Sequence, residues 1–406
     1  MVVPGPSGRP SDSTSGNALG IVPAAQPPLW RDERFWKVFF QVVAVIVVAS
    51  VLAIALTNMN RNLALQGRNF NFAFLTQVAG FNIGESILPF TRSDSYLYAF
   101  FVGFVNTLRL IFVAIPFATI LGLVAGIASF SSNWLLRKLS LLYVEVMRNI
   151  PILLVLFIWY FVVFFGITGT EDLTQASPLL LLSKKGIWIP WPAPTAMAWA
   201  SFALLGGGAI AAFLISRWRT KIMTEQGDPG KNQLYMLLGL GVAGLLIFFF
   251  GLGWRFPGGP DSNSVTGGLK ASLEYSAMLM ALAAHTGAFI AEVVRAGIQS
   301  VSKGQWEASR ASGLSQMQTM QLVVIPQALR VIVPSLNSQY ITLNKNSSLA
   351  LAIGYPEIFS VSQTTLNQAG RAVEILLLLT VTFLLLNLIT SFIMNRINAA
   401  VQFTER

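Results

Sequence analysis

SKGQWEASRASGLSQMQTMQLVVIP, residues 302–326, is a polar stretch between two long apolar segments of the chain. It contains two Ser-x-x-Gln patterns, Ser302 with Gln305 and Ser315 with Gln318. Each is typical of a capping box, in which the Ser side chain accepts from a free backbone N–H and the Gln side chain reaches back to the cap. The stretch therefore predicts two short helices whose starts are held by their own side chains.

Two further residues indicate where these short helices end. Gly313 lies just before the second box and suits the end of the first helix, since glycine readily adopts the left-handed conformation found there. Pro326 ends the second helix or opens the next apolar span. Residues 302–326 are thus predicted to form a tightly held helix–turn–helix loop between two membrane spans.

The composition places the chain in a membrane. Hydrophobic residues make up 54% and charged residues 11%, whereas soluble domains average about 25% charged. The chain has no cysteine and only one histidine, His285, which excludes disulfides, thiolate metal sites and multi-histidine metal sites. We therefore expect no catalytic site and no metal site. The net charge of +10 indicates basic cytoplasmic loops rather than nucleic-acid binding.

Apolar runs of about 20 residues, the length that crosses a bilayer as a helix, divide the chain. They predict an all-α membrane protein with about eight spans, at residues 38–57, 97–129, 151–166, 195–216, 234–253, 271–298, 327–350 and 372–395. The Pro-, Gly- and Ser-rich start predicts a disordered tail at residues 1–30, and no cleaved signal segment is expected. The remaining divisions are a first spanning segment 31–57, an extracytoplasmic segment 58–96, a core in two parts at 97–166 and 271–398, an insertion 167–270 with two extra spans, and a tail 399–406.

The loop charges predict an orientation. With the N-terminus in the cytoplasm and eight alternating spans, sixteen Lys and Arg residues fall on the cytoplasmic side and eight on the other. The positive-inside rule favours this arrangement. It places both termini and residues 302–326 in the cytoplasm.

Several ionisable residues are predicted at membrane depth, where each costs about 2.5–3.5 kcal/mol to insert. They are Arg109, Glu145, Arg148, His285, Glu292, Arg295, Lys345 and Glu374. Glu292 and Arg295 are three residues apart on a helix and can pair. Glu145 and Arg148 share that spacing. His285 is expected to be a packing residue.

Lys345 differs from the other charges because no acid lies near it in the sequence. It belongs to residues 344–348, five consecutive polar residues inside an apolar span. Such interruptions in transporters often line a water-filled cavity, where an ammonium group can hold a substrate carboxylate. The alternative is that Lys345 pairs with an acid on another helix.

Two sets of residues resemble known families. Glu307-Ala308-Ser309, Gly313 and Ile325-Pro326 resemble the E-A-A…G…I-x-L-P loop of ABC importer permeases, with Ser309 and Val324 departing from that pattern. Four further segments are similar to polar amino acid permeases, at residues 106–108, 143–151, 288–297 and 344–349. Residues 70–95 and the insertion resemble the larger permease of bacterial general L-amino-acid ABC transporters.

The resemblance implies a type I importer fold with a five-helix core in residues 97–166 and 271–398, in the bacterial inner membrane. It implies three kinds of partner besides lipid: a second similar permease, two cytosolic ATPase subunits and a periplasmic amino-acid-binding protein. The chain has no G-x-x-x-x-G-K-[ST] phosphate-binding motif of its own. ATP is therefore expected on the partner subunits, with no cofactor and no enzymatic activity in this chain.

The resemblance also implies two groups of site residues. The ATPase-coupling residues would be Glu307, Ala308, Arg310, Gly313 and Pro326. The substrate-binding residues would be Lys345, Asn346, Ser347, Asn106, Thr107 and Pro151. Asn346 stands where some permeases for cationic amino acids have Asp, which favours a weaker preference for positive side chains.

Other function classes fit the sequence less well. An ion-coupled secondary transporter is the alternative, although no internal repeat is evident. The residues offer no acid pair, metal cluster or nucleophile–base set for an enzyme, and no repeated filter segment for a channel. Which amino acids are carried, whether this subunit binds them, whether it pairs with itself or with a second permease, and what the insertion does stay open.

Overall fold

The computed structural model describes residues 33–65, 67–167, 174–177, 179–225, 230–260 and 264–402. The chain divides into two compact units, Met1–Asn71 and Phe72–Arg406, and each is considered by itself. The predicted tail at residues 1–30 lies outside the described residues.

The described part of the first unit contains one helix, α1 (Glu33–Leu65). It continues beyond residue 57, where the apolar run ends. Its spanning segment Phe35–Leu65 is apolar on every side and has no buried share within the unit, which is the pattern of a helix surrounded by lipid. Near its start, Phe35, Trp36 and Phe39 pack their rings against one another.

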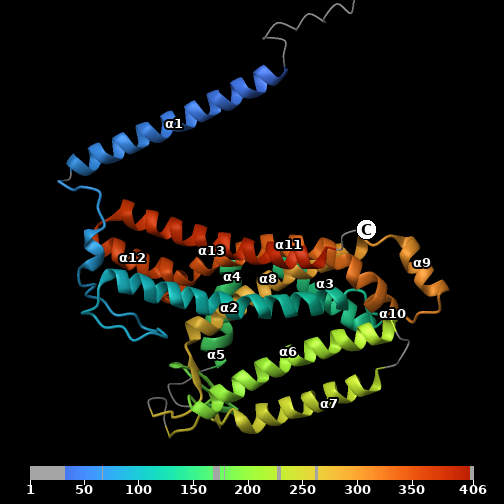
Figure 1. The fold of residues 1–406 in the computed structure, drawn as a ribbon. Coiled ribbons are helices and arrows are strands. Elements are labelled where there is room, and N and C mark those ends of the chain that lie inside the picture. Colours follow the sequence, from blue (N-terminus) through green and yellow to red (C-terminus); the bar gives the residue numbers. More distant parts are fainter. Residues whose placement is uncertain are drawn as a thin grey trace, which may run out of the picture. The chain divides into compact units, whose positions relative to one another are not determined.

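The second unit is mainly helical (Figure 1). Its first part contains η2 (Ala73–Thr76), α2 (Tyr96–Ala128), α3 (Trp134–Asn149), α4 (Ile152–Phe157), the π-helical η3 (Ile158–Phe164) and α5 (Phe165–Ile167). The insertion contains β1 (Thr174–Ser177), β2 (Leu180–Ser183), β3 (Gly186–Ile189), β4 (Trp191–Pro192), α6 (Ala196–Glu225), α7 (Lys231–Leu246), the π-helical η4 (Ile247–Gly251), β5 (Trp254–Arg255) and β6 (Leu269–Ala271).

The last part of the second unit runs from α8 to α13. It contains α8 (Leu273–Gln299), α9 (Lys303–Ala311), α10 (Gln316–Thr319), the π-helical η5 (Met320–Val324), α11 (Ile325–Asn346), the 3₁₀ turn η6 (Ser347–Ile353), α12 (Ile358–Ala369) and α13 (Ala372–Val401). Seven helices in the described ranges are long and apolar enough to cross a membrane, and eight if α3 and α4–η3 form one bent span. This agrees with the predicted all-α membrane fold of about eight spans.

The core of this unit forms around α8, whose spanning window is 67% buried, the largest share of any candidate span in the described residues. Its partner α2 approaches closely at two glycines. A Cβ built on Gly122 would lie 2.5 Å from the Ile290 side chain, and one on Gly126 would lie 2.6 Å from Val294. The Gly-x-x-x-Gly spacing therefore serves close helix packing here.

A sharp bend of 110° separates α3 from the α4–η3 segment. Ile150 is extended (φ −98°, ψ 129°) and Pro151 follows it as the N-cap of α4, because a residue before proline avoids the helical region. The preceding polar and basic residues, 131–149 in the sequence, form helix α3 over most of their length. Pro151 thus marks an elbow in the chain.

The insertion contains two small antiparallel sheets that the sequence patterns did not indicate. One has the strand order β1-β2-β3-β6 and the other pairs β4 with β5. The sequence of residues 167–192 and 254–270 predicts loops, and this prediction is wrong where the strands form. Their pairing joins residues that are distant in the chain, such as Trp188 and Lys270. A local alternation of apolar and polar residues therefore did not predict these strands.

The 302–326 loop has the predicted helix–turn–helix form, with one capping box rather than two. The Ser315 box is present, with Gln318 N donating to Ser315 Oγ and Ser315 N donating to Gln318 Oε1. The box predicted at Ser302 is wrong, because the Ser302 side chain makes no cap hydrogen bond. Gln305 instead accepts a hydrogen bond from Gln327 on α11, at 3.2 Å.

Candidate functional site

The polar residues near the end of α11 change the helix geometry. After Asn346 the chain tightens into the 3₁₀ turn η6, which ends at Gly354 in the left-handed conformation (φ 80°). Ser347 Oγ donates to Asn344 O at 2.7 Å, and Ser348 Oγ donates to Lys345 O at 2.8 Å. These side-chain bonds satisfy backbone carbonyls that the α-helix leaves free at its end.

Lys345 points out of this turn and is exposed. No ion pair involves it in the part of the chain that the structure describes, so the alternative of an acid on a neighbouring helix finds no support within this subunit. Asn344, beside it, is buried and donates to Asn387 and Thr390 of α13. The asparagine thus anchors the segment, while the lysine remains available to a ligand.

Asn346 and Ser347 complete the substrate-binding residues predicted in this turn. Asn346 is half-buried, and Ser347 is fully buried. Only Lys345 among these three presents an exposed side chain. Pro151, the fourth predicted residue outside α2, is exposed at the bend between α3 and α4.

Asn106 and Thr107 on α2 are fully buried, with no exposed surface. Asn106 Nδ2 donates to Glu85 O at 2.8 Å and to Pro356 O at 2.9 Å. Thr107 Oγ1 accepts from Ile358 N at 3.0 Å. These two residues therefore fasten α2 to the 354–358 turn and to the loop before α2.

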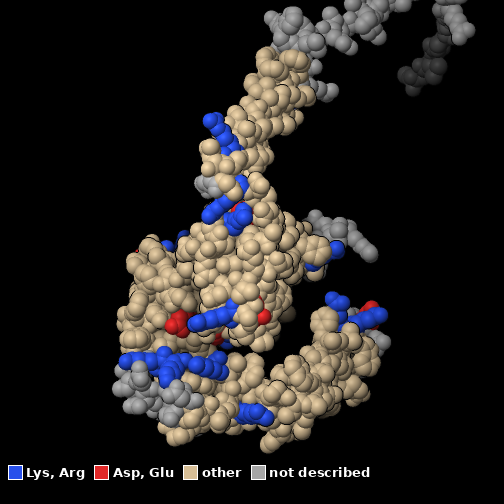
Figure 2. All heavy atoms as spheres, turned by 90° about the vertical axis from the view of Figure 1, so that its left-hand side faces the viewer, with Lys and Arg blue, Asp and Glu red and all other residues tan. Residues whose placement is uncertain are grey.

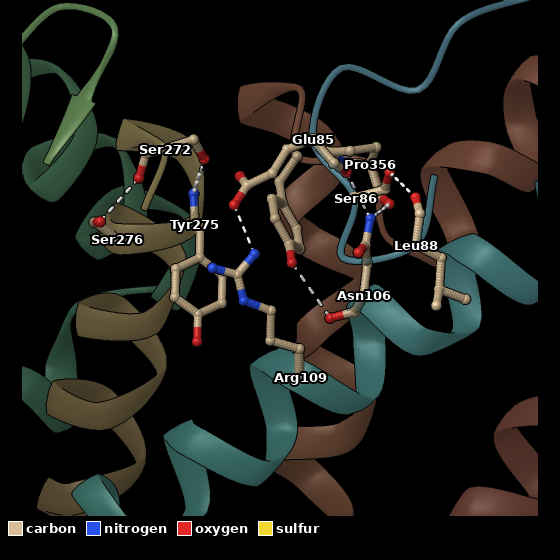
Figure 3. A network of polar contacts seen from close by, with 10 residues as sticks. Glu85, Ser86, Leu88, Asn106, Arg109, Ser272, Tyr275, Ser276 and Pro356 are labelled. Carbon is tan, nitrogen blue, oxygen red and sulfur yellow. Dashed lines mark hydrogen bonds and ion pairs between the residues drawn. The ribbon is translucent and has the colours of Figure 1, made fainter. Parts of the chain in front are cut away.

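An ion pair that the sequence patterns did not indicate lies in the same region (Figure 3). Arg109 Nη1 lies 2.6 Å from Glu85 Oε1. The guanidinium stacks over the Tyr275 ring of α8, 4.0 Å from its centroid, a cation–π arrangement. Figure 3 shows Arg109 reaching from α2 toward Tyr275 while Glu85 approaches from the loop.

Most of the other predicted intramembrane charges are paired or packed. Glu292 accepts from Arg295 Nε at 3.0 Å, as predicted. Arg148 pairs with Glu292 at 3.5 Å, whereas a Glu145 pair is not among the ion pairs of the described residues. The His285 ring packs against Phe289, with centroids 5.1 Å apart. Buried Glu374 pairs with Arg371 at 3.4 Å.

Glu357 lies outside the spanning helices, at the start of α12, and is fully buried. Its carboxylate accepts from the backbone N–H groups of Phe359 and Ser360, at 2.8 and 2.7 Å. Burial raises its pKa to about 8, and the two backbone hydrogen bonds oppose that rise. Across the described ranges, no group of three or more His, Cys, Asp or Glu side chains is placed to hold a metal ion.

The second candidate site is α9 and the turn that follows it. Glu307, Ala308, Arg310 and Gly313 are all exposed. The helix ends in a Schellman motif, in which Leu314 N donates to Ser309 O. Gly313 has a φ of 77° and open space around the position of a Cβ. Pro326 lies apart from these four, half-buried in the first turn of α11.

Helices α12 and α9, which belong to the surroundings of the two candidate sites, lie at opposite ends of the spanning helices (Figure 1). The segment before α2 and helix α12 lie at one end, and α9 lies at the other. A signal between the two sites must therefore pass along the helices that join them, and α11 runs from the α9 end to Lys345.

Comparison with known proteins identifies the family. Residues 234–403 match the binding-protein-dependent transport system inner membrane component family. The chain is 38% identical to the putative amino-acid ABC transporter permease YhdX of Escherichia coli, covering 92% of this chain and 95% of the relative. It is 37% identical to the general L-amino acid transport system permease AapQ of Rhizobium johnstonii, covering 92% of this chain and 94% of the relative. The chain belongs to the amino-acid ABC transporter permeases.

A third relative of this permease is the glutamate/glutamine/aspartate/asparagine transport system permease BztB of Rhodobacter capsulatus, at 33% identity over 92% of this chain and 96% of the relative. Two solved structures are similar at low identity. An amino acid ABC transporter with histidines gives 19% identity and a TM-score of 0.45, covering 75% of this chain and 95% of that chain. The MetNI methionine ABC transporter gives 18% identity and a TM-score of 0.44, covering 76% of this chain and 98% of that chain.

The permease is thus a multi-pass inner membrane protein and a transport subunit. The sequence located its exposed lysine and its exposed α9 loop. It did not indicate Glu85 as the partner of Arg109, since the two are far apart in the chain and share no periodic pattern. The only available signal was that Arg109, a charge in an apolar span, requires a partner.

Proposed function

We propose that this permease moves L-amino acids from an extracytoplasmic binding protein into the cytoplasm by alternating access, as one membrane subunit of a type I ABC importer. The observation that carries the proposal is the exposed turn after α9, which is held by the Schellman motif at Gly313 and the capping box at Ser315. A rigid exposed element of this kind can transmit movement from a cytosolic partner to the helices that follow it.

The cytosolic partner in this proposal is a pair of ATPase subunits that bind and hydrolyse ATP. Glu307 and Arg310 are exposed charges on α9 and would form ion pairs across that interface. Ala308 and Gly313 present little side-chain volume, which permits close approach of the partner. Pro326 lies in the first turn of α11 and would transfer the movement of α9 to that helix. This chain itself would bind no cofactor.

The substrate site is proposed around the exposed end of α11. The Lys345 ammonium would hold the α-carboxylate of the amino acid in a charge-assisted hydrogen bond. Asn346 and Ser347 would shape the turn beside it, and Pro151 would border the path at the bend. Because Asn106 and Thr107 are buried, we propose that they position the 354–358 turn and act on substrate through it.

The remaining parts of the proposal concern assembly and orientation. A second, homologous permease would complete the transport path, together with one binding protein. The excess of Lys and Arg in alternate loops supports a cytoplasmic location for both termini and for α9. The same charge distribution is typical of bacterial inner membrane proteins.

The test is a pull-down of the ATPase with the tagged permease from a gentle detergent extract. Wild type is compared with Ala308→Trp and Gly313→Trp on α9, and with Gly206→Trp as the matched control. Gly206 lies in α6 and also has open space around it. We expect both α9 variants to lose the ATPase and the Gly206 variant to retain it.

Uptake measurements then test the energy source. Uptake that persists in the presence of an uncoupler, while ATP is held constant, supports the importer. Uptake that collapses under those conditions, with no ATPase recovered from the wild type, would show an ion-coupled transporter instead.

A further inference from the structure

A cavity of about 520 Å³ lies in the insertion, beside the N-terminal turns of α6. Its walls include Trp191, Trp199, Phe202, Arg255, Gly267 and Gly268. These residues are separate from both candidate sites described above. The volume is typical of small-molecule sites, which measure roughly 300–1,000 Å³.

The walls of this cavity are held in place by backbone geometry. Trp191 on β4 and Arg255 on β5 are directly paired across the small sheet. Gly267 and Gly268 have φ values of 79° and 68°. A Cβ on Gly268 would lie 2.6 Å from Ile189 O. The backbone therefore approaches closely at this wall of the cavity.

The cavity lies where a membrane-spanning helix begins. The spanning part of α6 starts at Ala196, and only 11% of its apolar window is buried within the protein. Most of the surface of this helix is therefore open to lipid. Trp199 is 69% exposed and Trp191 is 48% exposed. Tryptophan is enriched where spanning helices meet the headgroup layer, so the cavity opens at the membrane–water interface.

Charge selects the kind of ligand. Arg255 is exposed and has no acidic partner among the described residues. The described residues 179–216, 251–260 and 264–272 contain the basic residues Lys184, Lys185, Arg255 and Lys270 and no Asp or Glu. Figure 2 shows the corresponding end of the molecule, where patches of Lys and Arg lie on a largely uncharged surface with a few Asp and Glu side chains among them.

These observations favour an anion over a cation. Aromatic walls alone would suit a quaternary ammonium group, but a guanidinium in the same wall repels it. A phosphate matches the fork of the arginine donors. The tryptophan and phenylalanine faces then offer an apolar surface for a hydrocarbon chain.

We propose that this cavity binds an anionic phospholipid from the leaflet that meets the N-terminal end of α6. Its phosphate contacts Arg255, and an acyl chain lies along Trp199 and Phe202. The site gives the insertion a function in anchoring the permease to a lipid class. It does not depend on the transport mechanism proposed above.

The experiment uses the purified transporter complex that contains the full permease chain. The complex is incubated with mixed vesicles of equal phosphatidylglycerol and phosphatidylethanolamine, extracted again and washed, and its retained lipid is measured by mass spectrometry. The variants are Arg255→Gln, Arg255→Lys and Trp199→Ala. Lys184→Gln is the matched control, because it removes an exposed cation outside the cavity.

We expect wild type and Lys184→Gln to retain phosphatidylglycerol in preference to phosphatidylethanolamine. Arg255→Gln should lower that retention about tenfold, as expected for one charge-assisted hydrogen bond. Arg255→Lys should restore part of it, which separates loss of charge from misfolding. Trp199→Ala should lower retention of both lipids.

Two results would overturn the proposal. One is equal phosphatidylglycerol retention by wild type and Arg255→Gln. The other is that soluble glycerol phosphate displaces the phospholipid completely and that Trp199→Ala leaves lipid retention unchanged. This pair of results would show a site for a soluble anion.

Discussion

Arg109 on α2 and Glu85 in the preceding loop form an ion pair at 2.6 Å, with side chains 15% and 20% exposed. The same guanidinium rests on the ring of Tyr275 on α8. One arginine thus connects a loop and two spanning helices. A charge in this position is stable only while its partner is present, because an unpaired charge in a poorly hydrated site is costly.

We expect Glu85→Gln to lower the free energy of unfolding by about 2 kcal/mol, since the amide keeps the size of the side chain and removes its charge. The measurement is thermal unfolding of the purified protein in detergent. Lys221→Gln is the control, because its pair with Glu225 is 68% and 61% exposed and is worth only about 0.5 kcal/mol. Equal shifts in the two variants would contradict a special role for Glu85.

The glycine contacts between α2 and α8 give a second prediction. Gly126→Ala should destabilise the protein by about 1–3 kcal/mol, as overpacking does, because its Cβ would lie 2.6 Å from Val294 and 2.9 Å from Ala291 O. Gly239→Ala in α7 is the matched control, since that position has open space. The comparison is made by thermal unfolding in the same detergent. If Gly126→Ala matches the control, the two helices are not in close contact.

The sequence predicted the features that local pattern controls. Apolar runs located the spans, and Gly313 and the Ser315 box located the turn after α9. It did not predict features made by distant residues, such as the β3–β6 pairing and the Glu85–Arg109 pair. The prediction of a capping box at Ser302 was wrong for the same reason. Gln305 accepts a hydrogen bond from Gln327 on α11, a contact that the local sequence pattern does not contain.

The candidate substrate residues show the same division. Sequence correctly indicated that Lys345 has no acidic neighbour along the chain. The burial of Asn106 and Thr107 depends on the 354–358 turn folding over α2. That contact joins residues about 250 positions apart, and no spacing rule covers such a distance.

Glu357 predicts a dependence of stability on pH. Its pKa is raised by burial from 4.5 to about 8, so the folded protein favours the protonated form. The stabilisation is fully present below about pH 4.5 and is lost as pH rises through about 8. Melting temperatures between about pH 5 and 9 should therefore fall in wild type. Glu357→Gln, which cannot ionise, should show a smaller slope, and identical slopes would rule this carboxyl out as the cause.

Lys345 gives the prediction that bears on transport. In liposomes containing the complete transporter, Lys345→Gln should raise KM for amino acid uptake by about 10- to 100-fold, as expected for loss of one charge-assisted hydrogen bond of about 1.5–3 kcal/mol. Lys345→Arg keeps the positive charge and should retain part of the affinity. ATP hydrolysis without substrate should be unchanged in both variants, because the α9 turn lies at the other end of α11.

Lys184→Gln serves as the control for this transport experiment, because it removes an exposed lysine from the β2–β3 turn and leaves α11 untouched. Its KM should equal that of wild type. An unchanged KM in Lys345→Gln as well would place the carboxylate contact on another subunit. A change in KM confined to Lys345 would instead identify the exposed end of α11 as the point where this permease meets its substrate, since the neighbouring Asn344 and Ser347 are buried.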